Sequence, residues 1–250
     1  MTPAPLPFFQ KQILDRKKEL EAVEEYPWEE LAMVIGEVGF SCTLCARCCT
    51  REFNGHVLLL DEDAARIRSI DPAALAPPPE FDLSDQHGTF YVAGYTLRAQ
   101  PGKRGDCHFL MDGRCRIYQE RPMICRIYPY MLHREPDEEG VFDWRHVSGL
   151  DQHGEYHFPI LPDVAREIAC DVKAFEAAVL RQEIAFFEYA ARYFPAHGLR
   201  PVRKRFDDGM RALRAGAAVR VEVFFGGAFE SWVVQGGECT PSATKKSAGI

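Results

Sequence analysis

Four cysteines lie within eight residues of one another, at Cys42, Cys45, Cys48 and Cys49. Thiolates spaced two residues apart can reach one ion from a single turn of backbone. Soft sulfur ligands also select zinc, iron or iron–sulfur clusters over hard cations. We therefore interpret the chain as a metal protein.

Three further cysteines recur together after a long gap, at Cys107, Cys115 and Cys125, whereas Cys170 and Cys239 stand alone. A disulfide framework is typical of short secreted chains with paired cysteines, but this chain has 250 residues, nine cysteines and no recognisable secretory leader. We accordingly expect reduced thiols and a cytoplasmic location. We interpret the two lone cysteines as unconnected with the metal.

Charge gives a second signal near the cysteines. The chain has 30 basic and 37 acidic residues, and its net charge of −7 argues against broad affinity for nucleic acid or anionic lipid. No apolar run is long enough to cross a membrane. Basic residues nevertheless gather beside both cysteine groups: Arg47, Arg51, Lys103, Arg104, Arg114, Arg116, Arg121 and Arg126. These cations either offset the negative charge of a thiolate site or form a solvated basic face.

The elements that must position the cysteines follow from periodicity and turn residues. Helical spacing predicts helices over residues 8–25, 28–36 and 163–194, and Asp61 is expected to cap another that runs to residue 70. Strand-forming residues cover 57–60 and 89–97, and Gly226-Gly227 between two alternating runs predicts a C-terminal β-hairpin.

These elements predict an α+β fold, a small metal-stabilised cysteine-cluster domain with helical flanks. We expect four segments: an N-terminal helical segment, the metal-binding domain, a long helix and hairpin packed on that domain, and a flexible tail, at residues 1–39, 40–160, 161–235 and 236–250. Within the second segment, Cys115-Arg116-Ile117-Tyr118 recurs as Cys125-Arg126-Ile127-Tyr128. Pro122 forbids one continuous helix through both copies, so two turns are expected to present sulfur toward a common centre.

The two cysteine elements resemble the YkgJ-type cysteine-cluster family, which has a Cys-x-x-Cys-x-x-Cys-Cys signature and is described as zinc- or iron-chelating. The resemblance spans residues 40–130 and rests on the runs 42–49 and 115–129, with Cys107 between them. It implies metal or iron–sulfur binding by all seven clustered cysteines, and flagellin lysine N-methylases are similar more distantly. The ligand set implied by the resemblance is Cys42, Cys45, Cys48, Cys49, Cys107, Cys115 and Cys125.

Coordination chemistry leaves several functions open, because seven sulfurs exceed the four that fill a mononuclear zinc site or a cubane cluster. An iron–sulfur cluster for redox or enzymatic chemistry ranks first. A zinc-stapled protein-binding module, with zinc or mononuclear iron as the structural metal, ranks second, and metal storage or delivery third. The sequence does not decide whether the chain is an enzyme, and it identifies no protein partner.

Histidines are secondary candidates. His146, His153 and His157 lie close together, and on a strand the alternation from His153 to His157 would place both imidazoles on one face. His108 is adjacent to Cys107. Surface or hydrogen-bonded histidines are commoner than ligands, so we do not assign these four to the site.

Overall fold

One long helix organises the molecule. In the computed structural model, which describes residues 7–51, 55–101, 105–138 and 140–242, helix α6 covers Pro162–Ala196. Its 35 residues span about 52 Å at 1.5 Å per residue, and Pro162 occupies the first turn, where its missing N–H is no loss. The predicted helix over 163–194 is therefore confirmed.

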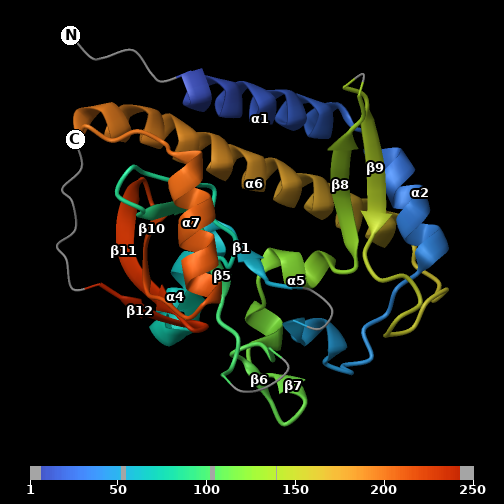
Figure 1. Ribbon diagram of the computed structural model, residues 1–250. Coiled ribbons are helices and arrows are strands. Elements are labelled where there is room, and N and C mark those ends of the chain that lie inside the picture. Colours follow the sequence, from blue (N-terminus) through green and yellow to red (C-terminus); the bar gives the residue numbers. More distant parts are fainter. Residues whose placement is uncertain (1–6, 52–54, 102–104, 139, 243–250) are drawn as a thin grey trace.

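The N-terminal helices lie along α6, as Figure 1 shows. Helices α1 (Pro7–Glu25) and α2 (Trp28–Val38) match the two predicted there. The buried residues of α6 belong to two hydrophobic clusters. Val172 and Phe175 pack in a cluster with residues of α2, while Phe186 and Phe194 pack with Phe9 of α1.

The larger sheet has the strand order β12-β11-β10-β4-β3. Its strands are β3 (Leu83–Ser84), β4 (Phe90–Ala93), β10 (Val219–Phe225), β11 (Ala228–Gln235) and β12 (Glu238–Pro241). The predicted C-terminal hairpin is confirmed as β10–β11, and β10 also pairs in parallel with β4, with Val221 opposite Phe90. Strand β12 pairs with β11 where a flexible tail from residue 236 was expected; the rest of that tail, from residue 243, lies outside the described residues.

A smaller sheet has the order β1-β5-β2, formed by β1 (Leu58–Leu59), β5 (Tyr95–Leu97) and β2 (Leu75–Ala76). The strand predicted over 89–97 is interrupted at Gly94, which has φ +71° and separates β4 from β5. Helix α4 (Asp61–Ile70) begins at Asp61 itself, so the predicted capping role is wrong. The Asp61 carboxylate instead accepts a hydrogen bond from the Gly226 N–H at 3.1 Å.

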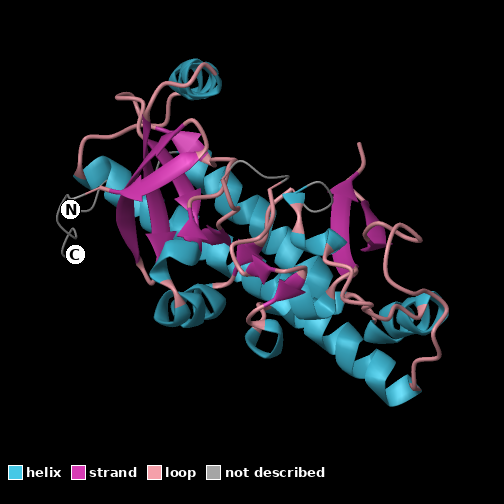
Figure 2. Ribbon diagram, turned by 90° about the horizontal axis from the view of Figure 1, so that it is seen from below, coloured by secondary structure: helices cyan, strands magenta, loops and turns pink. Residues whose placement is uncertain are grey.

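The remaining elements are short, apart from one hairpin and one helix. They are η1 (Arg47–Cys49), η2 (Pro72–Ala74), β6 (Leu110–Met111), β7 (Arg114–Cys115), η3 (Tyr118–Glu120), α5 (Met123–Ile127), β8 (Tyr130–Pro136), β9 (Phe142–Val147) and α7 (Arg203–Arg214). Figure 2 shows the larger sheet toward one end of α6 and the β8–β9 hairpin toward the other, with short strands between them. The fold is mixed α+β, as the sequence predicts. Within the described residues, no helix is both long enough and apolar enough to cross a bilayer.

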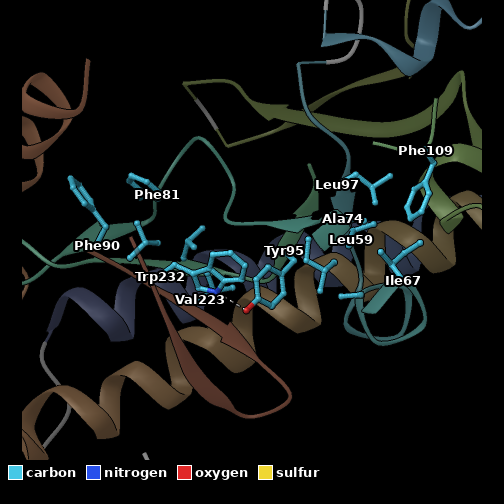
Figure 3. Packing of buried hydrophobic residues seen from close by; sticks show 14 of the residues in the cluster. Leu59, Ile67, Ala74, Phe81, Phe90, Tyr95, Leu97, Phe109, Val223 and Trp232 are labelled. Atoms are coloured by element: carbon cyan, nitrogen blue, oxygen red, sulfur yellow. Dashed lines mark hydrogen bonds between the residues drawn. The ribbon is translucent and has the colours of Figure 1, made fainter. Parts of the chain in front are cut away.

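The core of the two sheets continues toward the cysteine-bearing segments. Figure 3 shows this cluster extending from Phe90 past Trp232 and Tyr95 to Leu97 and Phe109. Within it, the Trp232 indole N–H donates to the Tyr95 hydroxyl at 2.9 Å. Leu97 and Phe109 are both at most 5% exposed, and each also lines the cavity described below. The wall of the site is therefore a continuation of the hydrophobic core.

Candidate metal centre

The first cysteine group lies on an irregular segment between α2 and β1. Leu44 and Ala46, on either side of Cys45, have φ values of 58° and 61°. Left-handed backbone at a residue other than glycine costs about 1–2 kcal/mol, and such strain concentrates at functional sites. The segment then closes into η1, which carries Cys48 and Cys49.

Backbone N–H groups surround the sulfur of Cys45. Burial acts to raise the pKa of this thiol, but hydrogen bonds from the N–H groups of Arg47, Gly154 and Cys45 itself, and from the Thr43 side chain, outweigh it. The net pKa of Cys45 is lowered. Donors that favour thiolate are what a sulfur ligand of a metal requires.

The two cysteine groups are joined directly by backbone hydrogen bonds. Thr50 and Asp106 form an antiparallel bridge, and the Cys107 N–H donates to the Cys49 carbonyl at 2.8 Å. The side chain of Gln100 donates to the Cys107 carbonyl at 2.9 Å. The long loop between the groups is therefore closed by the protein's own backbone as well as by any metal.

The repeated tetrapeptides adopt different local structures. Cys115 lies in β7, opposite Leu110 of β6, whereas Cys125 lies in α5, where its N–H donates to the Pro122 carbonyl at 2.9 Å. Both sulfur-bearing residues nevertheless line the same cavity. The expectation that the two copies face a common centre is therefore met by a strand and a helical turn, not by two similar turns.

All seven clustered cysteines line one cavity of about 530 Å³. Cys42 and Cys45 are exposed, and the other five are partly buried. Cys170 lies exposed on α6 and, like Cys239 on β12, does not line this cavity. All nine thiols are free, and within the described residues no three His, Cys, Asp or Glu side chains lie close enough together to hold one ion.

Burial and neighbouring thiols hold most of these sulfurs in the protonated form. Burial raises the pKa of Cys107 to about 11 and raises those of Cys115 and Cys125, and in each case nearby thiols add to the effect. The adjacent Cys48 and Cys49 are coupled by a hydrogen bond between their thiols. This bond raises the pKa of Cys48 and lowers that of Cys49. A metal cation at the cavity would supply the positive charge that converts such thiols to thiolates.

The arginines near the cysteines divide into distinct roles. Arg121 acts to lower the pKa of Cys115 and Cys125, and its guanidinium lies 4.0 Å from the centroid of the Tyr118 ring. Arg47 donates to the Gln152 carbonyl at 2.9 Å. Arg114 and Arg126 line the cavity. Lys103 and Arg104, expected in the basic patch, lie outside the described residues.

The structure separates the candidate histidines. His146 is in β9 and lies 2.7 Å from the Tyr26 hydroxyl, and His108 contacts Asp71 at 2.7 Å. His153 and His157 are not on a strand, so the condition under which they would share a face is not met. His153 alone of the four lines the cavity, where it is 8% exposed and stacks on Tyr128.

His56 is a cavity residue that the sequence analysis did not single out. It is partly buried and lines the cavity beside Cys48 and Cys49. Burial lowers the pKa of His56, and the neutral imidazole is the form that binds metals. No spacing motif marks this isolated histidine, so only its placement seven residues after Cys49 was available as a signal.

A loop that follows β9 completes the site. Ser41 and Glu155 exchange backbone hydrogen bonds of 2.8 and 3.0 Å, and the Phe158 N–H donates to the Gly39 carbonyl at 2.8 Å. The Phe40 ring packs against His153 and Tyr156. The start of the first cysteine group is thus fixed by residues more than a hundred positions later in the chain.

Comparisons with known proteins bear on this region. Residues 41–148 match the family model CxxCxxCC, described as "Putative zinc- or iron-chelating domain". No curated protein and no solved structure matches the chain. The match covers both cysteine groups and ends before the loop at residues 149–158 that packs on the first group. The resemblance seen in the cysteine spacing is confirmed by this match, which covers residues 41–148 of the 250-residue chain.

Proposed function

We propose that the chain holds an iron–sulfur cluster, bound by thiolates from both cysteine groups and used in redox or enzymatic chemistry. The observation that carries this proposal is that seven cysteines from segments far apart in the sequence line one cavity. The family description supports zinc or iron chelation in general. The choice of a cluster rests on the size of the cavity and the spread of the donors.

A single ion is a poor match for this donor set. Tetrahedral zinc with sulfur ligands at about 2.3 Å brings its thiolates to within about 3.8 Å of one another. Within the described residues, no three His, Cys, Asp or Glu side chains form a group that could hold one ion. The cavity of about 530 Å³ also falls within the range of about 300–1,000 Å³ that is typical of small-molecule and cofactor sites. A polynuclear centre, whose terminal thiolates are further apart, fits this arrangement better than one zinc or iron ion.

The N–H donors at Cys45 support the same choice. Hydrogen bonds to ligand sulfurs and solvent exposure help to set the reduction potentials of iron–sulfur clusters. Cys45 accepts such bonds from the backbone N–H groups of Arg47 and Gly154. Nine free thiols are also compatible with a reducing compartment, and we propose a cytoplasmic location.

The ligand set we propose is the seven cavity cysteines. Not all seven can be terminal ligands of one cubane, which takes four. The others would serve a second centre or support the first. Cys48 and Cys49 are the pair best placed to divide between these roles, because the Cys48 thiol donates to the Cys49 sulfur and lowers only the latter's pKa.

Anaerobic purification followed by metal and acid-labile sulfide analysis tests the proposal. We expect a brown protein that contains iron and sulfide, sharply reduced metal content in Cys125→Ser, and unchanged content in Cys170→Ser. Cys170 is the matched control because it is an exposed thiol on α6 outside the cavity. A colourless protein with stoichiometric zinc would instead support the zinc-stapled module, and equal effects of the two substitutions would contradict the assignment of ligands.

A further inference from the structure

We infer that the cysteine cavity also contains a binding site for an organic anion with an apolar body, such as an aromatic or branched carboxylate, held by Arg114 and Arg126. Its role as a substrate site rests on the metal centre proposed above, whereas binding itself does not. Three features of the cavity support the inference: its volume, the sign of the charges on its wall, and two guanidinium groups that have no ion-pair or hydrogen-bond partner among the described residues.

The cavity is large enough for a small organic molecule beside a metal centre. Its volume of about 530 Å³ lies within the range of about 300–1,000 Å³ that is typical of small-molecule sites. Away from the sulfurs its wall is largely apolar, and includes Phe40, Val57, Leu97, Phe109 and Ile124. Such a wall favours a ligand with an apolar body over a free inorganic anion.

The charged groups on the wall are all of one sign. Arg114, Arg121 and Arg126 line the cavity, and among the described residues no aspartate or glutamate does. This is unusual for a chain in which acidic residues outnumber basic ones by 37 to 30. The one-sided charge predicts that the ligand is an anion.

Two of the three arginines are available to a ligand. Arg121 donates to the Tyr118 carbonyl at 3.0 Å, stacks over the Tyr118 ring and acts on the thiols of Cys115 and Cys125. Arg114 and Arg126 form no ion pair or side-chain hydrogen bond within the described part of the chain. They approach the cavity from different elements, β7 and α5. A carboxylate bound by both guanidinium groups would accept charge-assisted hydrogen bonds from each.

Fluorescence titration with two matched dyes tests the inference on the full-length protein. The probes are 1-anilinonaphthalene-8-sulfonate, which is apolar and anionic, and N-phenyl-1-naphthylamine, which has the same rings without the charge. In Arg114→Gln/Arg126→Gln we expect the affinity for the sulfonate to fall by at least tenfold, because two charge-assisted hydrogen bonds are lost. The affinity for the neutral dye should stay within twofold of the unsubstituted protein.

The control is Arg116→Gln, which removes an exposed arginine next to the β6–β7 hairpin that does not line the cavity. It should leave both affinities unchanged. The inference is overturned if Arg116→Gln has the same effect as the double substitution, or if both dyes weaken together. It is also overturned if the double variant loses its metal, since the arginines would then serve to offset the charge of the centre. Metal and sulfide analysis of the same preparations tests the proposed cluster separately, because sulfonate binding that depends on Arg114 and Arg126 can persist whichever metal is found.

Discussion

Replacing Gly154 by alanine should loosen the first cysteine group from the loop that supports it. Gly154 has φ +77°, and a Cβ added there would lie 2.4 Å from Cε2 of Phe40 and 3.1 Å from the Ser41 carbonyl oxygen. Its N–H donates to the Cys45 sulfur. Any shift that relieves the clash therefore moves this N–H relative to a proposed ligand.

The expected magnitude has two components. Left-handed backbone at alanine costs about 1–2 kcal/mol, and forcing an additional carbon into a packed contact costs about 1–3 kcal/mol more. We expect Gly154→Ala to lower the free energy of unfolding by about 2–5 kcal/mol. Weakening the hydrogen bond to a charged sulfur, worth about 1.5–3 kcal/mol, should speed metal release about tenfold or more.

The matched control is Gly140→Ala in the turn between β8 and β9. Gly140 has φ +83°, but an added Cβ would meet no atom of the described residues within 4 Å. This variant therefore carries the backbone cost without the contact with Phe40. Urea unfolding and the rate of metal transfer to a chelator are measured for both variants. If the two lose equal stability and release metal at the same rate, the loop at residues 149–158 does not support the centre.

Three further predictions address the rest of the molecule. Tyr95→Phe removes the hydroxyl that donates to Glu230 at 2.5 Å and accepts from Trp232. Urea unfolding should therefore show a free energy of unfolding lowered by about 2–4 kcal/mol. A decrease below about 0.5 kcal/mol would refute the stabilising role of this hydrogen-bond network. Burial raises the pKa of Glu176 above 4.5 even though Arg134 is its partner. The folded state thus retains a proton that the unfolded state loses, and stability should fall as pH rises from 4.5 through the folded-state pKa; Glu176→Gln should flatten this slope in unfolding measured from pH 4 to pH 7, and an unaltered slope would contradict the assignment. Removal of metal by a chelator should leave the far-ultraviolet circular dichroism nearly unchanged, because α1 and α6 pack in a cluster that contains no cysteine. A large loss of helicity would show instead that the metal supports the whole fold.

The elements that the sequence predicted well are those specified by local pattern. Helix α6 follows from apolar residues at helical spacing, and the β10–β11 hairpin from Gly226-Gly227 between alternating runs. A second pair, Gly236-Gly237, precedes β12 in the same way. The small, polar residues around it instead favour a flexible tail, so the sequence does not distinguish this turn from disorder.

The elements that were missed depend on tertiary contacts. Strands β8 and β9 contain charged residues such as Arg134, which is only 10% exposed because it forms ion pairs with Glu19 of α1 and Glu176 of α6. Helix α7 has no fully buried residue and contributes only partly buried side chains to the core. The parallel pairing of β4 with β10 joins segments about 130 residues apart, and no local signal encodes it.

In the candidate site too, local sequence pattern identifies some residues, and tertiary contacts alone bring the others to the cavity. Spacing and resemblance identified the seven cysteines, since sulfur ligands must come from particular residues in particular order. His56 and His153 reached the cavity only through folding, and the loop at residues 149–158 contacts the first cysteine group through backbone atoms. Backbone contacts leave little trace in residue type, apart from glycines such as Gly154 where a side chain has no room.

The way the cavity is built is the physical basis of the proposed site for an organic anion. A structural zinc site encloses its ion fully with four ligands and leaves no open coordination position. Here Leu97 and Phe109 carry the hydrophobic core up to the cavity wall, while the backbone already joins the two cysteine groups through Cys49 and Cys107. Backbone hydrogen bonds thus contribute to closing the loop, and the cavity of about 530 Å³ is lined by arginines and by no described carboxylate. Space and positive charge of this kind are what the proposed organic anion requires.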